Sequence, residues 1–264
     1  MRFLHLSDIH FLREYPSAEK GYNSIFNNMT SPLIQIRRSL EKIDLSKIDF
    51  VIITGDLVES GTYEDYVILK SELEKLLDNT PYILTLGNHD NKEAFYKGWF
   101  NKECNNPYNT VKEIGELRII SFDNSQYRNS NGFISDEQYK WLENQLKDTK
   151  KDTILMIHHH LIKDQFTTPA VSYNDRFENI IRESSIIGIF VGHTHHPFKG
   201  CFVDKPYFST GSLSFIGYDE SNGIVRFEES AKFNLCTYEN GKISVEVISA
   251  LDDSKLLGVV NFRE

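Results

Sequence analysis

Short apolar segments of this chain are repeatedly followed by aspartate, histidine or asparagine, residue types that bind metals and move protons. The six segment ends are Asp8-Ile9-His10, Gly55-Asp56, Gly87-Asn88-His89-Asp90, Asp123-Asn124, His158-His159-His160 and Gly192-His193-Thr194-His195. Each end alone is consistent with turn or cap chemistry. In α/β proteins, however, sites form outside the carboxyl ends of the strands, so the series predicts one shared site.

The last of these ends follows an apolar run from Ile186 to Val191, which predicts a buried strand. His193 and His195 lie two residues apart after Gly192, so in an extended segment their imidazoles project the same way. Imidazole is a common ligand of transition metals. The stretch therefore predicts half of a metal site, and the other segment ends are candidates for the rest.

Alternating strands and helices must position these residues over the first two thirds of the chain. The apolar pattern predicts strands at about 2–7, 50–53, 82–86, 117–122, 153–157 and 186–191, and helices at about 32–43, 62–77, 92–99 and 135–146. Ser31-Pro32 is a typical helix start, and Thr62 with Asp65 resembles a capping box. From Cys201 onward short alternating segments follow, and Asn240-Gly241 between two of them predicts a hairpin.

These elements predict one α/β domain over residues 1–264, with the chemical residues between 8 and 195 and antiparallel strands at about 201–250. Two mixed sheets packed face to face, with helices outside, accommodate both parts of the chain. The expected architecture is therefore a four-layer α-β-β-α sandwich.

Composition narrows the classes of partner. The formal net charge of −9 argues against general nucleic-acid binding, which needs a basic face. The three cysteines show no CxxC spacing, which favours a reducing cytoplasm over a disulfide framework. Residues 1–8 leave no room for an apolar signal segment, and no run approaches the ~20 apolar residues of a membrane span. We therefore expect a cytoplasmic protein without membrane or nucleic-acid partners.

The order DxH, GD, GNHD, H, GHxH over residues 8–195 resembles the calcineurin-like metallophosphoesterase superfamily. The most similar members are the bacterial class III cyclic-nucleotide phosphodiesterases and related glycerophosphodiesterases. The resemblance implies a dinuclear metal-dependent phosphoesterase that hydrolyses a phosphodiester, a cyclic nucleotide or a similar small diester. Its nucleophile would be a water or hydroxide between the two metals.

The resemblance also implies a ligand for each position. Asp56 would bridge the two metals. One metal would be held by Asp8, His10 and His195, and the other by Asn88, His158 and His193. Gly192 would let the chain turn so that the two histidines after it diverge to different ions. Imidazole and carboxylate ligands suit Mn, Fe or Zn, with Co and Ni as further candidates, and the expected ligand set contains no thiolate.

Several roles around these ligands stay open. By resemblance His89 hydrogen-bonds a phosphate oxygen or protonates the leaving alkoxide, and Asp90 orients its imidazole; the alternatives are a structural histidine and a helix cap. The ligand in the triple-histidine run is expected to be His158, with His159 or His160 as alternatives.

Three further polar positions are expected outside the ligand set. His5 inside the first strand is expected in the core, and His196 at the surface. Asp123-Asn124 is expected in a turn or in support of the site.

Other functions remain alternatives to the diesterase. Within the superfamily these are a phosphomonoesterase or nucleotidase, and a nuclease. A metal-free binding scaffold is disfavoured because every ligand position is filled. The expected partner is a small phosphoester substrate, with a homodimer left open. Residues 161–172 and 201–214 are expected to shape the substrate pocket.

Overall fold

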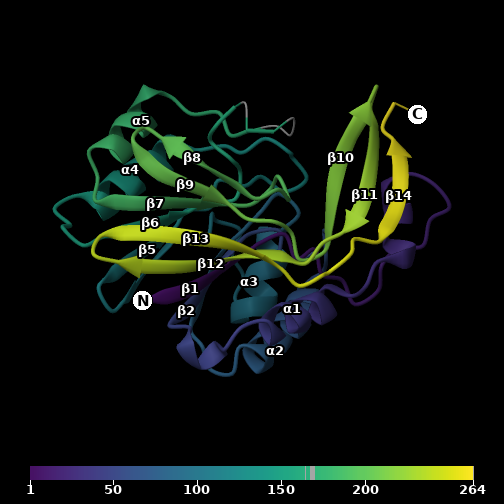
Figure 1. The fold of residues 1–264 in the computed structure, drawn as a ribbon. Helices are drawn as coiled ribbons and strands as arrows, with labels where there is room; N and C mark the ends of the chain where they lie inside the picture. Colours follow the sequence, from purple (N-terminus) through teal and green to yellow (C-terminus); the bar gives the residue numbers. More distant parts are fainter. Residues whose placement is uncertain (164, 167–169, 264) are drawn as a thin grey trace.

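Two mixed β-sheets lie at the centre of the structure, a computed structural model that describes residues 1–163, 165–166 and 170–263 (Figure 1). The strands of the first sheet, in spatial order, are β13 (Lys242–Ser249), β12 (Lys232–Glu239), β1 (Arg2–Leu6), β2 (Phe50–Thr54) and β3 (Tyr82–Thr85). Those of the second are β4 (Thr110–Ile114), β5 (Leu117–Ser121), β6 (Thr153–Met156), β7 (Ile186–Val191), β9 (Lys205–Ser209) and β8 (Phe198–Phe202).

Helices cover the outer face of each sheet. The helices are α1 (Pro32–Glu41), α2 (Tyr63–Leu76), α3 (Lys92–Phe100), α4 (Asp136–Leu146) and α5 (Asp175–Arg182). Leu4, Val51 and Leu84 of the first sheet share one apolar core with α1, α2 and α3. The second sheet packs on α4 and α5 in the same way. The predicted helix starts are confirmed, including a complete capping box at Thr62.

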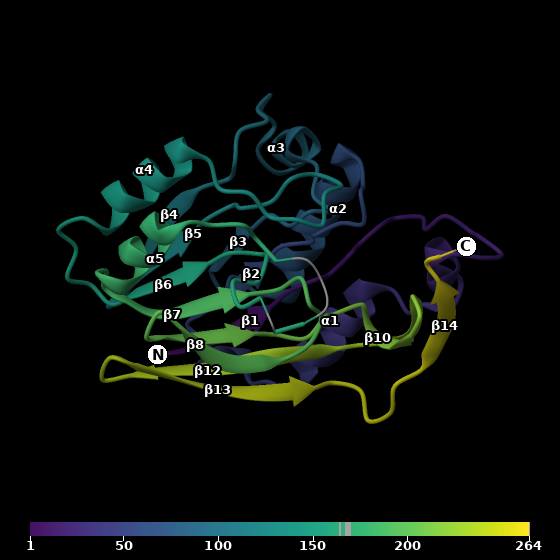
Figure 2. The same ribbon diagram turned by 90° about the horizontal axis from the view of Figure 1, so that it is seen from above.

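A third apolar core lies between the two sheets. Phe3 and Ile52 of the first sheet meet Ile119 and Phe190 of the second in this core. The layers are therefore helices, sheet, sheet and helices, which confirms the predicted four-layer sandwich. Figure 2 shows the same layers from above.

The C-terminal strands do not form one antiparallel unit. The Asn240-Gly241 turn joins β12 and β13 as predicted, and β12 pairs with β1 at the middle of the first sheet. A third sheet contains β10 (Phe215–Ser221), β11 (Ile224–Glu229) and β14 (Leu256–Asn261). It stands to one side of the main sheets in Figures 1 and 2 and packs on the short 3-10 helix η1 (Tyr22–Asn28). The alternating pattern of the sequence does not predict this separate sheet.

Parallel strands bring the predicted site residues to one edge of the sandwich. β1, β2 and β3 are mutually parallel, and so are β5, β6 and β7. The loops after them are also bonded together: the His10 amide donates to the Asp56 carbonyl at 2.9 Å, and the Gly192 amide donates to the His158 carbonyl at 3.0 Å. All six segment ends therefore follow strands whose carboxyl ends point the same way within each sheet.

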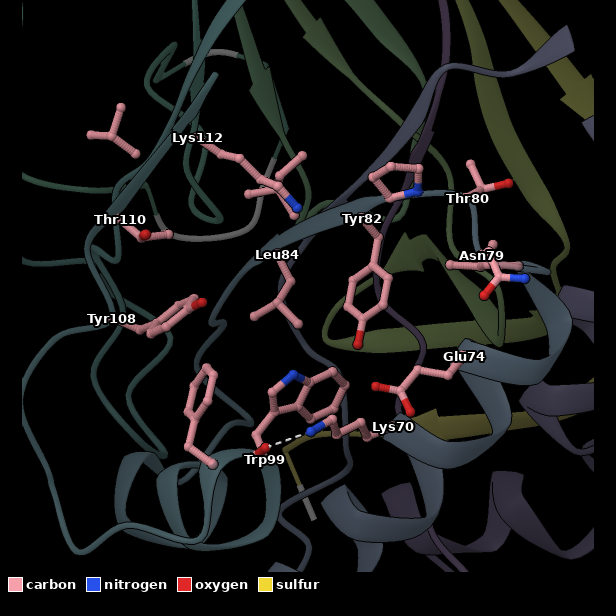
Figure 3. Close-up of a pocket in the computed structure, with 15 residues that line it drawn as sticks. Lys70, Glu74, Asn79, Thr80, Tyr82, Leu84, Trp99, Tyr108, Thr110 and Lys112 are labelled. Atoms are coloured by element: carbon pink, nitrogen blue, oxygen red, sulfur yellow. Dashed lines mark hydrogen bonds between the residues drawn. The ribbon is translucent and has the colours of Figure 1, made fainter. Parts of the chain in front are cut away.

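A cleft of about 670 Å³ lies at the other end of β3, between α2, α3 and β4 (Figure 3). Tyr82, Trp99 and Tyr108 line it, and Lys70 donates a hydrogen bond to the Trp99 carbonyl at 2.9 Å. None of the six segment ends contributes to its lining, so this cleft is separate from the predicted site. Within the described part of the chain, none of the helices has the length and apolarity that crossing a bilayer demands.

Candidate metal centre

The backbone at the strand ends is held in an unusual conformation. Five of the seven expected metal ligands have positive φ angles between 48° and 69°, although none is glycine: Asp8, His10, Asp56, His193 and His195. Such angles are uncommon for residues with a side chain, and they cluster at functional sites. All five residues lie in the loops that follow strands, where the left-handed backbone turns the chain sharply.

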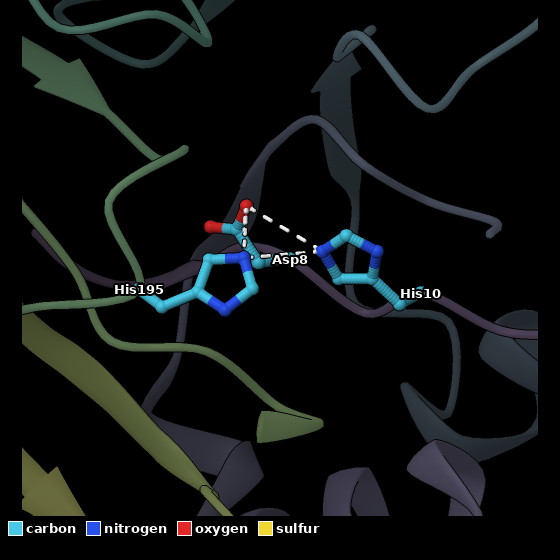
Figure 4. Close-up of side chains that lie close together, drawn as sticks. All are labelled: Asp8, His10 and His195. Carbon is cyan, nitrogen blue, oxygen red and sulfur yellow. Dashed lines mark hydrogen bonds and ion pairs between the residues drawn. The ribbon is translucent and has the colours of Figure 1, made fainter. Parts of the chain in front are cut away.

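The first cluster contains Asp8, His10 and His195, whose side chains point toward one another in Figure 4. The Nε2 atom of His195 lies 3.3 Å from Asp8 Oδ1 and 3.1 Å from Nε2 of His10. His10 Nε2 is 4.0 Å from the same Asp8 oxygen. The three ligand atoms therefore converge on one point.

The second cluster contains Asp56, His158 and His193, with Asn88 beside it. The Nε2 atom of His158 lies 3.2 Å from Asp56 Oδ2 and 3.2 Å from Asn88 Oδ1. The same Asp56 oxygen is 3.7 Å from His10 Nε2 of the first cluster. Asp56 thus lies between the two clusters, where the resemblance puts a bridging ligand.

The histidines are oriented as metal ligands usually are. In His158 and His195 the Nδ1 atom donates to a backbone carbonyl, that of Thr54 or Phe215, at 2.7 Å in both cases. Nδ1 of His10 lies 2.6 Å from a Glu59 carboxylate oxygen. Because hydrogen bonds through Nδ1 fix the ring and leave Nε2 for a metal, these residues fit a metal pair.

Two buried carboxylates give the site its negative charge. Burial raises the pKa of Asp56, but the facing His158 and His89 imidazoles outweigh this effect and hold the pKa well below its usual value. Burial likewise raises the pKa of Asp8, and the adjacent His195 outweighs it and lowers this pKa to about 2. Both groups are ionised at neutral pH, and buried carboxylates at such close range favour bound cations.

The carboxylate beside the His89 imidazole is Glu59. Its Oε1 atom lies 2.9 Å from His89 Nδ1, and its Oε2 atom bonds His10. Burial lowers the pKa of His89, but Asp56 and Glu59 outweigh it and raise the value to about 10. His89 is 26% exposed, so the ring that Glu59 holds also reaches solvent.

The prediction that Asp90 orients His89 is wrong. The Asp90 carboxylate accepts hydrogen bonds from the Leu57, Val58 and Gly87 amides and from the Tyr66 hydroxyl. It lies fully buried beneath the loops and ties the second strand end to the third. The physical reason is direction: the turn after Gly87 points Asp90 into the core, while Glu59 approaches the imidazole from the loop after β2.

Glu59 was not predicted from the sequence, because no local pattern marks it as a site residue. Glu59 follows Asp56 by three residues in a loop where neither helical nor strand periodicity applies. The Tyr22 hydroxyl also donates a hydrogen bond to this carboxylate at 3.4 Å.

The remaining polar residues surround the clusters. His5 lies fully in the core, with Nε2 2.9 Å from the Thr54 hydroxyl, as predicted. Asn124 bonds the His159 ring at 3.3 Å, and Asp123 pairs with Lys92 at 2.9 Å. Both support the loops around the site, as expected.

His196, expected at the surface, is instead partly buried. Its ring packs between Phe166 and Tyr218, with centroid distances of 4.3 and 5.4 Å. Its Nε2 atom lies 2.9 Å from the Gly217 carbonyl oxygen of β10. The side chain therefore anchors the third sheet to the loop that carries His195.

The family model and the known proteins that match this chain indicate the same family. Residues 1–197 match the family model described as calcineurin-like phosphoesterase. A probable glycerophosphodiester phosphodiesterase, GpdQ, from Arcobacter nitrofigilis is 42% identical over 160 residues, which cover 56% of this chain and 57% of that protein. A probable cyclic nucleotide phosphodiesterase from Rhodococcus erythropolis is 28% identical over 212 residues, which cover 77% and 67% of the two chains.

A solved structure has the same fold. Purple acid phosphatase PPD1 from yellow lupin seeds aligns with a TM-score of 0.63 over 99% of this chain and 54% of that chain, at 14% identity. The match to the Arcobacter protein spans less than two thirds of that relative. Calcineurin-like phosphoesterases use divalent metal ions, in agreement with the two ligand clusters. This chain belongs to the calcineurin-like phosphoesterase family.

Proposed function

We propose that this chain is a dinuclear metal-dependent phosphodiesterase that hydrolyses a small diester such as a cyclic nucleotide or a glycerophosphodiester. The observation that carries the proposal is the position of Asp56 between two clusters of metal-binding side chains. The names of the relatives, glycerophosphodiester and cyclic nucleotide phosphodiesterases, support the choice of a diester.

Each cluster takes one ion in this proposal. Asp56 would be shared by the two sites. The residues that would complete the first site are Asp8, His10 and His195, and those that would complete the second are Asn88, His158 and His193. His158 is preferred to His159 because its Nε2 atom faces Asp56, whereas the His159 ring bonds Asn124. Nitrogen and carboxylate ligands without thiolate support Mn, Fe or Zn, with Co or Ni as alternatives.

Two bound metal ions supply charge neutralisation at the phosphoryl group and a nucleophile derived from water. The protein's own residues hold the substrate and the leaving group. His89 has its Nδ1 atom on Glu59, which leaves Nε2 to donate a hydrogen bond to a phosphoryl oxygen or a proton to the leaving alkoxide. Glu59 is the positioning residue for this imidazole.

The proposal treats residues 1–264 as one catalytic domain. Its support is that β12, beyond the family match, pairs with β1 in the middle of the first sheet. The net charge of −9 supports a small substrate rather than nucleic acid. All three cysteines are free thiols, which supports a location in the reducing cytoplasm.

A substrate panel tests the proposal. Metal-free protein is reloaded with Mn²⁺ or Fe²⁺ and assayed on bis(p-nitrophenyl) phosphate, cyclic AMP, glycerophosphocholine and p-nitrophenyl phosphate. We expect cleavage of diesters only after metal is added. Preference for the monoester would support the phosphomonoesterase alternative. If none of these esters is cleaved with either metal, the proposal that the chain is an enzyme is contradicted.

A further inference from the structure

A tight turn, Gln126–Asn129, lies against the candidate metal centre. The Asn129 amide donates to the Gln126 carbonyl at 3.0 Å, which closes the turn. The Arg128 amide donates to the carbonyl of Asn88 at 2.8 Å. That carbonyl belongs to the peptide unit that joins Asn88, an expected metal ligand, to His89, which faces the substrate. The turn is therefore attached directly to the backbone of the proposed site.

Arg128 is an unusual choice for its place in this turn. It is the third of the four residues and has a φ of 59°. A positive φ at this position, as in type II turns, favours glycine or asparagine, because a side chain is strained there. An arginine gives the turn no conformational advantage, so the geometry of the turn does not explain why this residue is an arginine. The explanation must lie in what its side chain does.

The guanidinium of Arg128 is available to a ligand. Arg128 is exposed, and its guanidinium lies 5.0 Å from the centroid of the neighbouring Tyr127 ring. In the described part of the chain it forms no ion pair, whereas Arg176, Arg182 and Arg226 each pair with glutamate. The ring contact orients the group without neutralising its charge.

The charged groups around the His89 loop leave a role for a cation on the turn that carries Arg128. The Glu59 carboxylate lies 2.9 Å from the His89 imidazole. Lys92, two residues after Asp90, is already paired with Asp123 at 2.9 Å. A phosphoester anion approaching His89 therefore meets the Glu59 carboxylate beside the ring, and the Arg128 guanidinium on the adjoining turn is free to offset that charge.

We infer that Arg128 is a substrate-binding residue that holds an anionic oxygen of the phosphoester beside His89. Arginine suits this role because its planar guanidinium donates two parallel hydrogen bonds to a phosphoryl group. The inference rests on the proposed function and adds to it a residue outside the metal ligands and the His89–Glu59 pair.

The test uses Arg128→Asn, because asparagine suits the turn, together with Arg128→Lys. We expect Arg128→Asn to fold at least as stably as wild type and to retain both metals. Its KM for bis(p-nitrophenyl) phosphate should rise about tenfold, as should the dissociation constant of inorganic phosphate in calorimetry of the Mn²⁺-loaded protein. Arg128→Lys should have a KM and a phosphate dissociation constant between those of wild type and Arg128→Asn. Arg182→Asn on α5 is the matched control and should behave as wild type.

The outcomes separate this inference from the proposed function. If wild type cleaves the diester and binds phosphate, but Arg128→Asn has unchanged KM and phosphate affinity, the inference about Arg128 is overturned and the proposed function stands. If the loaded wild-type protein neither cleaves the diester nor binds phosphate, both are overturned. A purely structural role would alter the melting temperature without altering phosphate affinity.

Discussion

At the scale of single residues, the site depends on where each charge can be neutralised. Asp56 is 2% exposed and lies within 4 Å of the Nε2 atoms of both His10 and His158. A carboxylate in this position offsets the repulsion between two cations a few ångströms apart. Its charge therefore matters more to the proposed metal pair than its size.

The first prediction concerns this charge. Asp56→Asn keeps the shape of the side chain and removes the charge, so the metal content should fall below two ions per chain. The kcat for bis(p-nitrophenyl) phosphate should drop at least ~100-fold. Elemental analysis and the diester assay measure both effects. Asp123→Asn, at a strand end outside the clusters, should keep two ions; equal metal loss in the two variants would contradict the bridging role.

The second prediction separates Glu59 from Asp90. Glu59→Gln removes the charge that faces His89 and His10, and we expect kcat to fall roughly 10–100-fold. Asp90→Asn instead leaves buried amides with a poorer acceptor, so the free energy of unfolding should fall by about 1–3 kcal/mol. Steady-state kinetics and urea titration distinguish the two effects. A kinetic defect without loss of stability in Asp90→Asn would restore Asp90 as the orienting residue.

At the scale of elements, the strand ends approach one another so closely that glycine is needed for space. A Cβ atom on Gly87 would lie 2.1 Å from Asp56 Oδ1, and one on Gly192 would lie 2.0 Å from the Ser7 hydroxyl. Neither glycine has a positive φ. Gly192 is thus needed because the neighbouring strand end leaves no space for a side chain. The sharp turning of the backbone that was expected at Gly192 occurs instead at His193 and His195.

The third prediction follows from this close approach. Gly87→Ala pushes the loop after β3 away from Asp56, so the protein should lose roughly 1–3 kcal/mol of stability and part of its metal. Gly258→Ala is the control, since its Cβ would meet no atom closer than 3.8 Å. Urea unfolding and elemental analysis give the two values. Identical metal content in wild type and Gly87→Ala would contradict the proposed packing constraint.

The elements that could be predicted are those with strong local signals. Ser31-Pro32, the Thr62 capping box and Asn240-Gly241 carry their own turn and cap chemistry. β4 escaped prediction because its side chains are partly or fully exposed. α5 also escaped prediction, although its buried Phe177 and Ile181 lie four residues apart, as on one face of a helix. The order of strand ends predicts which residues meet, whereas Glu59 and Arg128 lie in loops whose path depends on tertiary contacts.

At the scale of the whole molecule, the site depends on the core beneath it. His5 on β1 is fully buried between the sheets, and its ring is hydrogen-bonded to the side chains of Thr54 and Asn234. Desolvation, opposed only in part by Asp8, lowers the pKa of His5 from 6.5 to about 3. The folded state thus requires neutral His5, which links protein stability to pH.

The fourth prediction gives the sign of this linkage. Because the folded pKa lies below the unfolded one, the stabilisation is present above pH 6.5 and is lost as the pH falls toward 3. His5 should account for roughly 2 kcal/mol of the stability that metal-free protein loses between pH 7 and pH 5. The free energies of unfolding of metal-free wild type and His5→Gln, measured at pH 7 and at pH 5, give this difference. Parallel pH profiles would contradict a neutral buried His5.

The central claim, a metal pair bridged by Asp56, is tested most directly by anomalous diffraction from crystals of the Mn²⁺-loaded protein. The account predicts two peaks about 3.5–4 Å apart on either side of the Asp56 carboxylate. One peak should lie among Asp8, His10 and His195, and the other among Asn88, His158 and His193. A single peak, or no peak at either cluster in fully loaded protein, would contradict the claim.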